Sequence, residues 1–111
     1  MGSNEVRKKN FVVDNELKTA RVVRYRLETA NFEVEETHSG LDGLRKIESF
    51  QPDLVVPDVV MEVMTGYKVC ARVKDNPLTR NLPVILLTSR IKFLDEKLGF
   101  ACKADAYIRK P

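Results

Sequence analysis

Short apolar runs alternate with longer amphipathic segments along this chain of 111 residues. Five runs, rich in aliphatic and aromatic side chains, predict β-strands at residues 10–13, 32–37, 54–56, 84–87 and 106–109. The third and fourth runs are almost continuously aliphatic, which is typical of strands covered on both faces of a sheet. The pattern therefore predicts a central sheet with a layer on each side.

The segments between these runs carry apolar residues at the spacing of an amphipathic helix. Four helices are predicted: at 15–30, from a Ser39 cap to residue 50, at 65–74, and after residue 88. Their expected buried stripes are Leu17, Ala20, Val23 or Arg24, and Leu27 in the first; Leu41, Leu44, Ile47 and Phe50 in the second; Tyr67, Cys70 and Val73 in the third; and Ile91, Leu94 and Leu98 in the fourth.

Strands that alternate with helices favour right-handed βαβ crossovers and a parallel sheet. Five strands and four helices make an open, doubly wound α/β domain, from which a final helix is missing. We therefore expect one domain over residues 9–111, truncated before its last helix, and a vector remnant and tail at 1–8. A truncated end would leave apolar surface uncovered, which favours a homodimer, domain swapping or low stability.

The charged residues are mixed in sign, with 19 Lys and Arg against 16 Asp and Glu and a net charge of +3. Such a balance does not favour direct nucleic-acid binding through bulk charge. No apolar run reaches membrane-spanning length. Cys70 and Cys102 lie far apart in apolar periodic stretches, which indicates buried free thiols in a reducing compartment. We expect a cytoplasmic protein without membrane contact.

Polar side chains stand at the exits of the predicted strands. Asp14 and Asn15 follow the first strand, Asp58 the third, Thr88 the fourth and Lys110 the fifth. Because sites in open α/β sheets form outside the carboxyl ends of the strands, these side chains are expected to converge. Asp58 is then presented at the mouth of the sheet, although a carboxylate that caps a helix or turn is a simpler explanation.

Two neighbouring carboxylates repel each other unless a cation joins them. Oxygen ligands without sulfur or imidazole suit a hard ion such as Mg²⁺. A carboxylate can also act as a nucleophile and accept a phosphoryl group as an acyl phosphate. Lys110 and the metal would neutralise the phosphoryl oxygens, and the Thr88 hydroxyl could donate a hydrogen bond to one of them. A solvated terminal lysine and a plain strand-end hydroxyl are the simpler alternatives.

The motifs FVVDNE, PDLVVPD, PVILLTS and ADAYIRKP, in this order and spacing, resemble the receiver domains of two-component response regulators over residues 9–111. The resemblance implies a flavodoxin-like sheet of order 2-1-3-4-5 and a Mg²⁺-dependent signalling switch. A sensor histidine kinase or a histidine phosphotransfer protein would donate the phosphoryl group, and an output domain could follow residue 111. Catalysis would be limited to the protein's own phosphorylation and dephosphorylation.

The resemblance also assigns a metal shell and an acceptor. It makes Asp58 the phosphoacceptor, and it makes Asp14 and Asn15 the pair of positions that hold Mg²⁺ together with Asp58. It makes Val60 the residue whose backbone carbonyl completes the metal shell.

A second group of positions is implied to bind phosphate and to switch. Thr88 and Lys110 match the hydroxyl and the lysine that bind the phosphoryl group, with the small Ser89 beside the site. Tyr107 matches an aromatic residue that reorients when the threonine engages phosphate, unless it is only an aromatic at the edge of the core.

The sequence departs from the family pattern in several places. Asn15 stands for an aspartate, Pro57 for the aliphatic residue before the acceptor, Glu62-Val63 for Pro-Gly in the next loop, and Lys103 for a glycine. Where the backbone still needs a positive φ, Lys103 costs about 1 kcal/mol. These departures support an alternative, a degenerate receiver that acts as a phosphorylation-independent interaction module. A flavodoxin-like binder of a nucleotide or flavin is disfavoured, because no glycine-rich loop follows the first strand.

Overall fold

The computed structural model describes residues 7–89 and 102–110 of the chain. Its strands and helices there are β1 (Lys9–Val13), α1 (Leu17–Thr29), β2 (Glu33–Thr37), α2 (Gly40–Phe50), β3 (Leu54–Pro57), α3 (Gly66–Asp75), β4 (Ile85–Thr88) and β5 (Ala106–Arg109). Each corresponds to a predicted element, and the predicted fourth helix lies outside the described residues. No helix within these ranges is long and apolar enough to cross a membrane.

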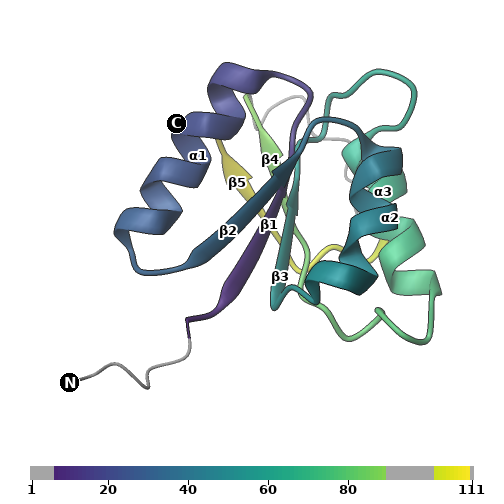
Figure 1. Ribbon diagram of the computed structural model, residues 1–111. Coiled ribbons are helices and arrows are strands. Elements are labelled where there is room, and N and C mark those ends of the chain that lie inside the picture. The colour runs from purple at the N-terminus through teal and green to yellow at the C-terminus, as the bar shows by residue number, and fades with distance from the viewer. Residues whose placement is uncertain (1–6, 90–101, 111) are drawn as a thin grey trace.

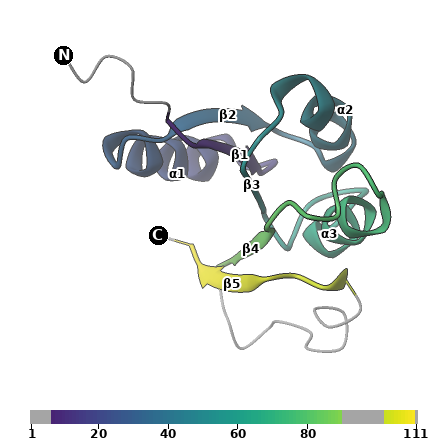
Figure 2. The same cartoon turned by 90° about the horizontal axis from the view of Figure 1, so that it is seen from below.

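The strands form a parallel sheet with helices on both faces, as Figures 1 and 2 show. β1 lies between β2 and β3, and β4 pairs with β5. Two parallel bridges, Val55 with Val84 and Asp58 with Leu87, join β3 to β4. The order 2-1-3-4-5 and the flavodoxin-like fold are therefore confirmed. α1 covers one face, and α2 and α3 cover the other.

The apolar core is divided by the sheet into two clusters. Successive residues of a strand point to opposite faces, so Phe11 and Val13 pack on the side of α2 and α3, whereas Val12 packs on the side of α1. Ala20 and Val23 of α1 meet Val12 in the smaller cluster. The apolar residues predicted for the strands thus provide a packing surface for helices on both faces of the sheet.

Two predicted core residues are wrong, because Leu17 and Leu41 are 52% and 49% exposed. Both lie in the first turn of their helices. In α2, Gly40 lies against the neighbouring helix α3, and an added Cβ there would be 2.9 Å from the Val69 side chain. This approach through a glycine turns Leu41 outward.

The predicted buried free thiols are confirmed for Cys70 and Cys102. The Cys70 thiol donates a hydrogen bond to the Cys102 carbonyl at 3.1 Å. Burial raises the pKa of Cys70, which keeps this thiol protonated and unreactive.

Pro57 lies inside β3 and interrupts its pairing with β4. The Val55 N–H donates to the Pro83 carbonyl at 3.0 Å, and the Val59 N–H donates to the Leu87 carbonyl at 2.7 Å. The N–H of the residue between them would face the Ile85 carbonyl, but proline has none. The sheet therefore consists of a three-stranded part (β2, β1 and β3) and a two-stranded part (β4 and β5), joined by two bridges only.

The two-stranded part is tied to α3 through Asp105. The Asp105 carboxylate accepts hydrogen bonds from the Val84 N–H and from Lys74 Nζ, both at 2.8 Å. Burial alone would raise the pKa of Asp105, but the bonds from Lys74 and Val84 outweigh burial and lower it. The ionised carboxylate therefore holds the starts of β4 and β5 against the helix layer.

The α1 side of the two-stranded part carries an apolar groove of about 260 Å³. Its lining residues come from α1, β3, β4 and β5, and they are Val23, Arg26, Leu27, Leu54, Val56, Ile85, Leu87, Ile108 and Arg109. On β5, Tyr107 is 37% exposed and Ile108 is 48% exposed. β5 is thus much less buried than β1, where Phe11, Val12 and Val13 have no exposure.

Candidate functional site

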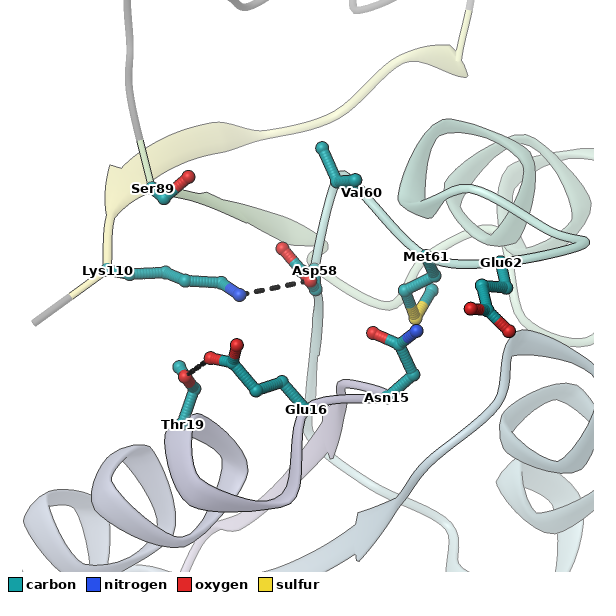
Figure 3. A pocket seen from close by; sticks show the side chains of 9 residues that line it. All are labelled: Asn15, Glu16, Thr19, Asp58, Val60, Met61, Glu62, Ser89 and Lys110. Atoms are coloured by element: carbon teal, nitrogen blue, oxygen red, sulfur yellow. Dashed lines mark hydrogen bonds and ion pairs between the residues drawn. The ribbon is translucent and has the colours of Figure 1, made fainter.

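Three charged side chains meet at the carboxyl ends of the strands. Asp14 follows β1, Asp58 follows β3 and Lys110 follows β5. Lys110 Nζ lies 3.0 Å from Asp58 Oδ2 and 3.2 Å from Asp14 Oδ2. Figure 3 shows the lysine reaching across to Asp58. Asp14 is fully buried and Asp58 is 3% exposed, so little of either residue is in contact with water.

Backbone hydrogen bonds fix the positions of these three residues. The Asp14 N–H donates to the Thr37 carbonyl at 3.0 Å, and the Asp58 N–H donates to the Val13 carbonyl at 2.8 Å. The Lys110 N–H donates to the Thr88 carbonyl at 2.7 Å. Parallel pairing thus brings the three strand ends to one edge of the sheet, as the sequence pattern predicts.

The charges of the site shift the pKa values of Asp58 and Lys110. Burial raises the pKa of Asp58 to about 6; the charge of Asp14 adds to this effect, and Lys110 opposes it. For Lys110, burial alone would lower the pKa, but the hydrogen bond and charge of Asp58, with the charge of Asp14, raise it overall. Near neutral pH the ammonium group of Lys110 therefore faces an ionised Asp58 carboxylate.

An open cavity of about 610 Å³ leads to Asp58 and Lys110. The residues that line it are Asn15, Glu16, Thr19, Asp58, Val60, Met61, Glu62, Ser89 and Lys110 (Figure 3). Two predicted metal residues, Asn15 and Val60, are therefore at the mouth of the site. Glu16, Thr19, Met61 and Glu62 were not predicted as site residues. Thr19 could have been found because it lies one helical turn after Glu16, which follows the first strand exit.

Three further predicted residues, Asp14, Thr88 and Tyr107, lie outside the lining of this cavity. Thr88, at the end of β4, is buried at 4% exposure, and its carbonyl accepts the Lys110 N–H. Tyr107 stands on β5 opposite Leu86 in the register. The structure thus attaches Thr88 to Lys110 through the backbone. Tyr107 lies two strand positions before Arg109, the residue that pairs with Thr88.

The loop after Asp58 contains a residue with positive φ that is not glycine. Val63 has φ of 66° and a fully exposed side chain. Lys103, which precedes β5, also has a positive φ, of 62°. The predicted cost of about 1 kcal/mol for a residue other than glycine therefore applies at this position. Gly66 is required for space, because a Cβ there would lie 2.2 Å from the Asp58 carbonyl oxygen. The Gly66 N–H closes the loop on the Val59 carbonyl at 3.0 Å.

The carboxylate oxygens of the site are suitable ligands for a hard divalent cation. Asp14 Oδ1 accepts the Glu16 N–H at 3.0 Å, while the buried Oδ2 accepts no hydrogen bond and has the Lys110 ammonium beside it. Oxygen ligands of this kind suit Mg²⁺. Within residues 7–89 and 102–110, no three Asp, Glu, His or Cys side chains are already grouped closely enough to hold a metal. The ligand set is therefore incomplete in the conformation described.

Comparison with known proteins identifies the family of this chain. The model of the response regulator receiver domain matches residues 11–111. The chain therefore belongs to the response regulator receiver domain family, as the motifs at the strand exits predict.

Curated relatives agree with this assignment. The chain is 34% identical over 104 residues to the alkaline phosphatase synthesis transcriptional regulatory protein PhoP of Bacillus subtilis, covering 94% of this chain and 42% of that protein. It is 30% identical over 103 residues to protein PilG of Pseudomonas aeruginosa, covering 93% of this chain and 76% of that protein. The chain thus spans less than half the length of the Bacillus regulator.

Solved structures share the fold over nearly the whole chain. The chemotaxis protein CheY4 of Vibrio cholerae superposes with a TM-score of 0.88 at 27% identity, covering 96% of this chain and 88% of that one. The response regulator TrrA of Thermotoga maritima, solved in complex with Mg²⁺ and BeF, superposes with a TM-score of 0.84 at 26% identity. That comparison covers 94% of this chain and 87% of TrrA.

Proposed function

We propose that this receiver domain is a phosphorylation-dependent switch whose acceptor is the carboxylate of Asp58. The observation that carries the proposal is the contact of this buried carboxylate with Lys110 Nζ at 3.0 Å, at the base of an open cavity. Asp58 combines two features among the acids at this edge of the sheet: it is deeply buried, and it lines the cavity. A phosphoryl group that enters the cavity would therefore reach the Asp58 carboxylate at its base.

The chemistry follows from this placement. An Asp58 oxygen attacks the phosphorus of a donor, a P–O bond forms, and the bond to the leaving group breaks, which yields an acyl phosphate. Lys110 then changes partner from a carboxylate oxygen to a phosphoryl oxygen and offsets the negative charge that arrives. A Mg²⁺ ion held by Asp14, Asp58, the Asn15 amide oxygen and the Val60 carbonyl would supply further positive charge. The pKa of Asp58, about 6, leaves the nucleophile mostly ionised at neutral pH.

The donor would be a histidine kinase or a histidine phosphotransfer protein, met in the cytoplasm. TrrA, a relative that shares the fold, was solved with Mg²⁺ and BeF, which supports a similar requirement in this chain. Thr88 would donate its hydroxyl to the phosphoryl group. Because its carbonyl already accepts the Lys110 N–H, a movement of Thr88 would be passed to the end of β5 and to Tyr107.

Intact mass after incubation with acetyl phosphate and Mg²⁺ tests the acceptor. Wild type should gain the mass of one phosphoryl group, and Asp58→Ala should gain none. Asp75→Ala, which removes an exposed carboxylate at the end of α3, is the matched control and should be modified like wild type. Wild type that stays unmodified with saturating donor and metal contradicts the proposal.

A degenerate receiver, acting as an interaction module without phosphorylation, is the second candidate. It is favoured by the neutral amide of Asn15 and by the absence of three grouped metal-binding side chains among the residues that the structure describes. Under this alternative, neither wild type nor Asp58→Ala would be modified, and replacing Asp58 would leave binding to a partner unchanged.

A further inference from the structure

The side chains around Lys110 carry less negative charge than would neutralise a divalent cation. Asp14 and Asp58 contribute two negative charges and Lys110 one positive charge, which leaves a net charge of −1. A divalent cation is balanced by −2, and Asn15 contributes a neutral amide. Two other acids, Glu16 and Glu62, line the same cavity and could supply the missing charge.

Geometry distinguishes these two acids. The backbone N–H of Glu16 donates to Asp14 Oδ1 at 3.0 Å, so its main chain is attached to one of the site carboxylates. In Figure 3 the Glu16 side chain leaves this loop on the side of Lys110, whereas the Asn15 amide turns toward Met61. Glu62 comes from the loop after Asp58 and lies beyond Met61 in the same view.

The side chain of Glu16 is also available for a ligand. Glu16 occupies the N-cap of α1, yet its carboxylate makes no capping bond to the helix. Instead its Oε1 accepts a hydrogen bond from the Thr19 hydroxyl, which keeps the carboxylate at the cavity wall. The residue is exposed, so packing does not hold its side chain in one conformation.

A buried oxygen of Asp14 gives independent support for a cation at this point. Asp14 is fully buried, and its Oδ2 faces the site without accepting any hydrogen bond. Lys110 approaches this atom at 3.2 Å but is 3.0 Å from Asp58, so the ammonium is shared between two acids. A cation that binds here would complete the coordination of Asp14 and leave Lys110 to a phosphoryl oxygen.

We infer that Glu16 is the third carboxylate of the divalent-cation site and supplies the charge that Asn15 does not. The inference rests on the proposed function, since it concerns the metal of the same site. With Asp14, Asp58 and Glu16 ionised and Lys110 protonated, the net charge becomes −2. Thr19 acts as a positioning residue that holds Glu16 at the wall of the cavity.

Calorimetric titration with MgCl₂, in the absence of any phosphodonor, tests this assignment. Glu16→Gln should weaken Mg²⁺ binding at least about tenfold, which corresponds to about 1.4 kcal/mol. Glu62→Gln makes the same chemical change in the same cavity, and it should alter the affinity less than about twofold. Asp14→Asn should abolish detectable binding, which confirms that the titrated ion occupies this site.

A second pair of variants tests whether a carboxylate at position 15 can replace the carboxylate at position 16. Asn15→Asp should tighten Mg²⁺ binding at least about tenfold, and it should melt at a lower temperature than wild type without metal, because three carboxylates then crowd one site. The double variant Asn15→Asp with Glu16→Gln carries the wild-type charge and should bind Mg²⁺ with nearly wild-type affinity. The shift of its melting temperature with Mg²⁺ should also match that of wild type.

The outcomes separate this inference from the proposed function. If wild type binds Mg²⁺ and is phosphorylated on Asp58, but Glu16→Gln binds Mg²⁺ as tightly as wild type, the role of Glu16 is refuted alone. Equal losses of Mg²⁺ affinity in Glu16→Gln and Glu62→Gln would also refute it, because they would show that any negative charge lining the cavity strengthens binding. Wild type that neither binds Mg²⁺ nor is phosphorylated overturns the proposed function together with this inference.

Discussion

The three-stranded and two-stranded parts of the sheet carry opposite charges of one site. The three-stranded part presents Asp14 and Asp58, and it is held together by continuous pairing of β1 with both neighbours. The two-stranded part presents Lys110 and meets β3 at two bridges only. Pro57 lies at this junction, directly before the proposed acceptor. The ion pairs of Lys110 thus link the two parts across a junction where β3 and β4 meet at isolated bridges.

The two parts also differ in burial. Phe11, Val12 and Val13 of β1 have no exposure, whereas Tyr107 and Ile108 of β5 are 37% and 48% exposed. Segments with few buried contacts open at lower free energy than the core. We therefore expect the lysine to be carried by the more easily displaced part, and the carboxylates by the more stable part.

Removal of the charge that links the two parts should have the largest effect. In Lys110→Met the buried carboxylates of Asp14 and Asp58 lose their shared cation, and breaking a buried ion pair from one side costs about 3 kcal/mol. We expect a fall of this size in the free energy of unfolding at neutral pH, measured with urea in metal-free buffer. The loss should shrink as the pH falls below about 6, where Asp58 takes up a proton.

The control for this variant is Lys68→Met, which removes an exposed lysine of α3. It should change the free energy of unfolding by less than about 0.5 kcal/mol. Equal losses in the two variants would mean that Lys110 does not link the two parts of the sheet.

Relief of backbone strain should have a smaller effect on the free energy of unfolding. Two strained positions can be compared, one near the acceptor and one before β5. Val63 and Lys103 both have positive φ and exposed side chains. Lys103→Gly should stabilise the protein by about 1 kcal/mol, and Val63→Gly by more, because a β-branched side chain tolerates this conformation worst. Urea unfolding measures both changes. Val60→Gly is the control: Val60 lacks a positive φ, so glycine there should destabilise, and a stabilisation would refute the strain argument.

The smallest effect on global stability is expected where the two parts meet. Pro57→Val restores an N–H that can bond to β4, worth about 1 kcal/mol, but it also makes the unfolded chain more flexible by a similar amount. The free energy of unfolding should therefore change little, while amide hydrogen exchange should change locally. The Val59 N–H, which bonds across the junction to Leu87, should exchange more slowly than in wild type.

An internal control comes from the adjacent residue. The Asp58 N–H bonds to Val13 within the three-stranded part, so its exchange should be unaffected by Pro57→Val. Equal slowing at Asp58 and Val59 would show that the substitution acts on the whole sheet and not on the junction.

Local sequence patterns were sufficient for the elements and for the edge of the sheet that carries the site. The apolar runs predict all five strands, because the alternation of buried faces depends on near neighbours in the chain. Asp14, Asp58 and Lys110 could be assigned to one edge because the carboxyl ends of parallel strands lie together. Ser39 was found as the cap of α2 for the same local reason, and its hydroxyl accepts the Asp42 N–H at 3.1 Å.

Contacts between distant segments were needed for the remaining features. The interruption at Pro57 depends on which N–H groups of β3 face β4, and the sequence of β3 alone does not set that register. Leu41 is exposed because Gly40 brings α2 against α3, a contact between two helices. Glu16 became a candidate ligand only when its side chain was seen to turn toward Lys110 while Asn15 turned away. Residues near in sequence decide local conformation, but packing of separate elements decides which side chains meet.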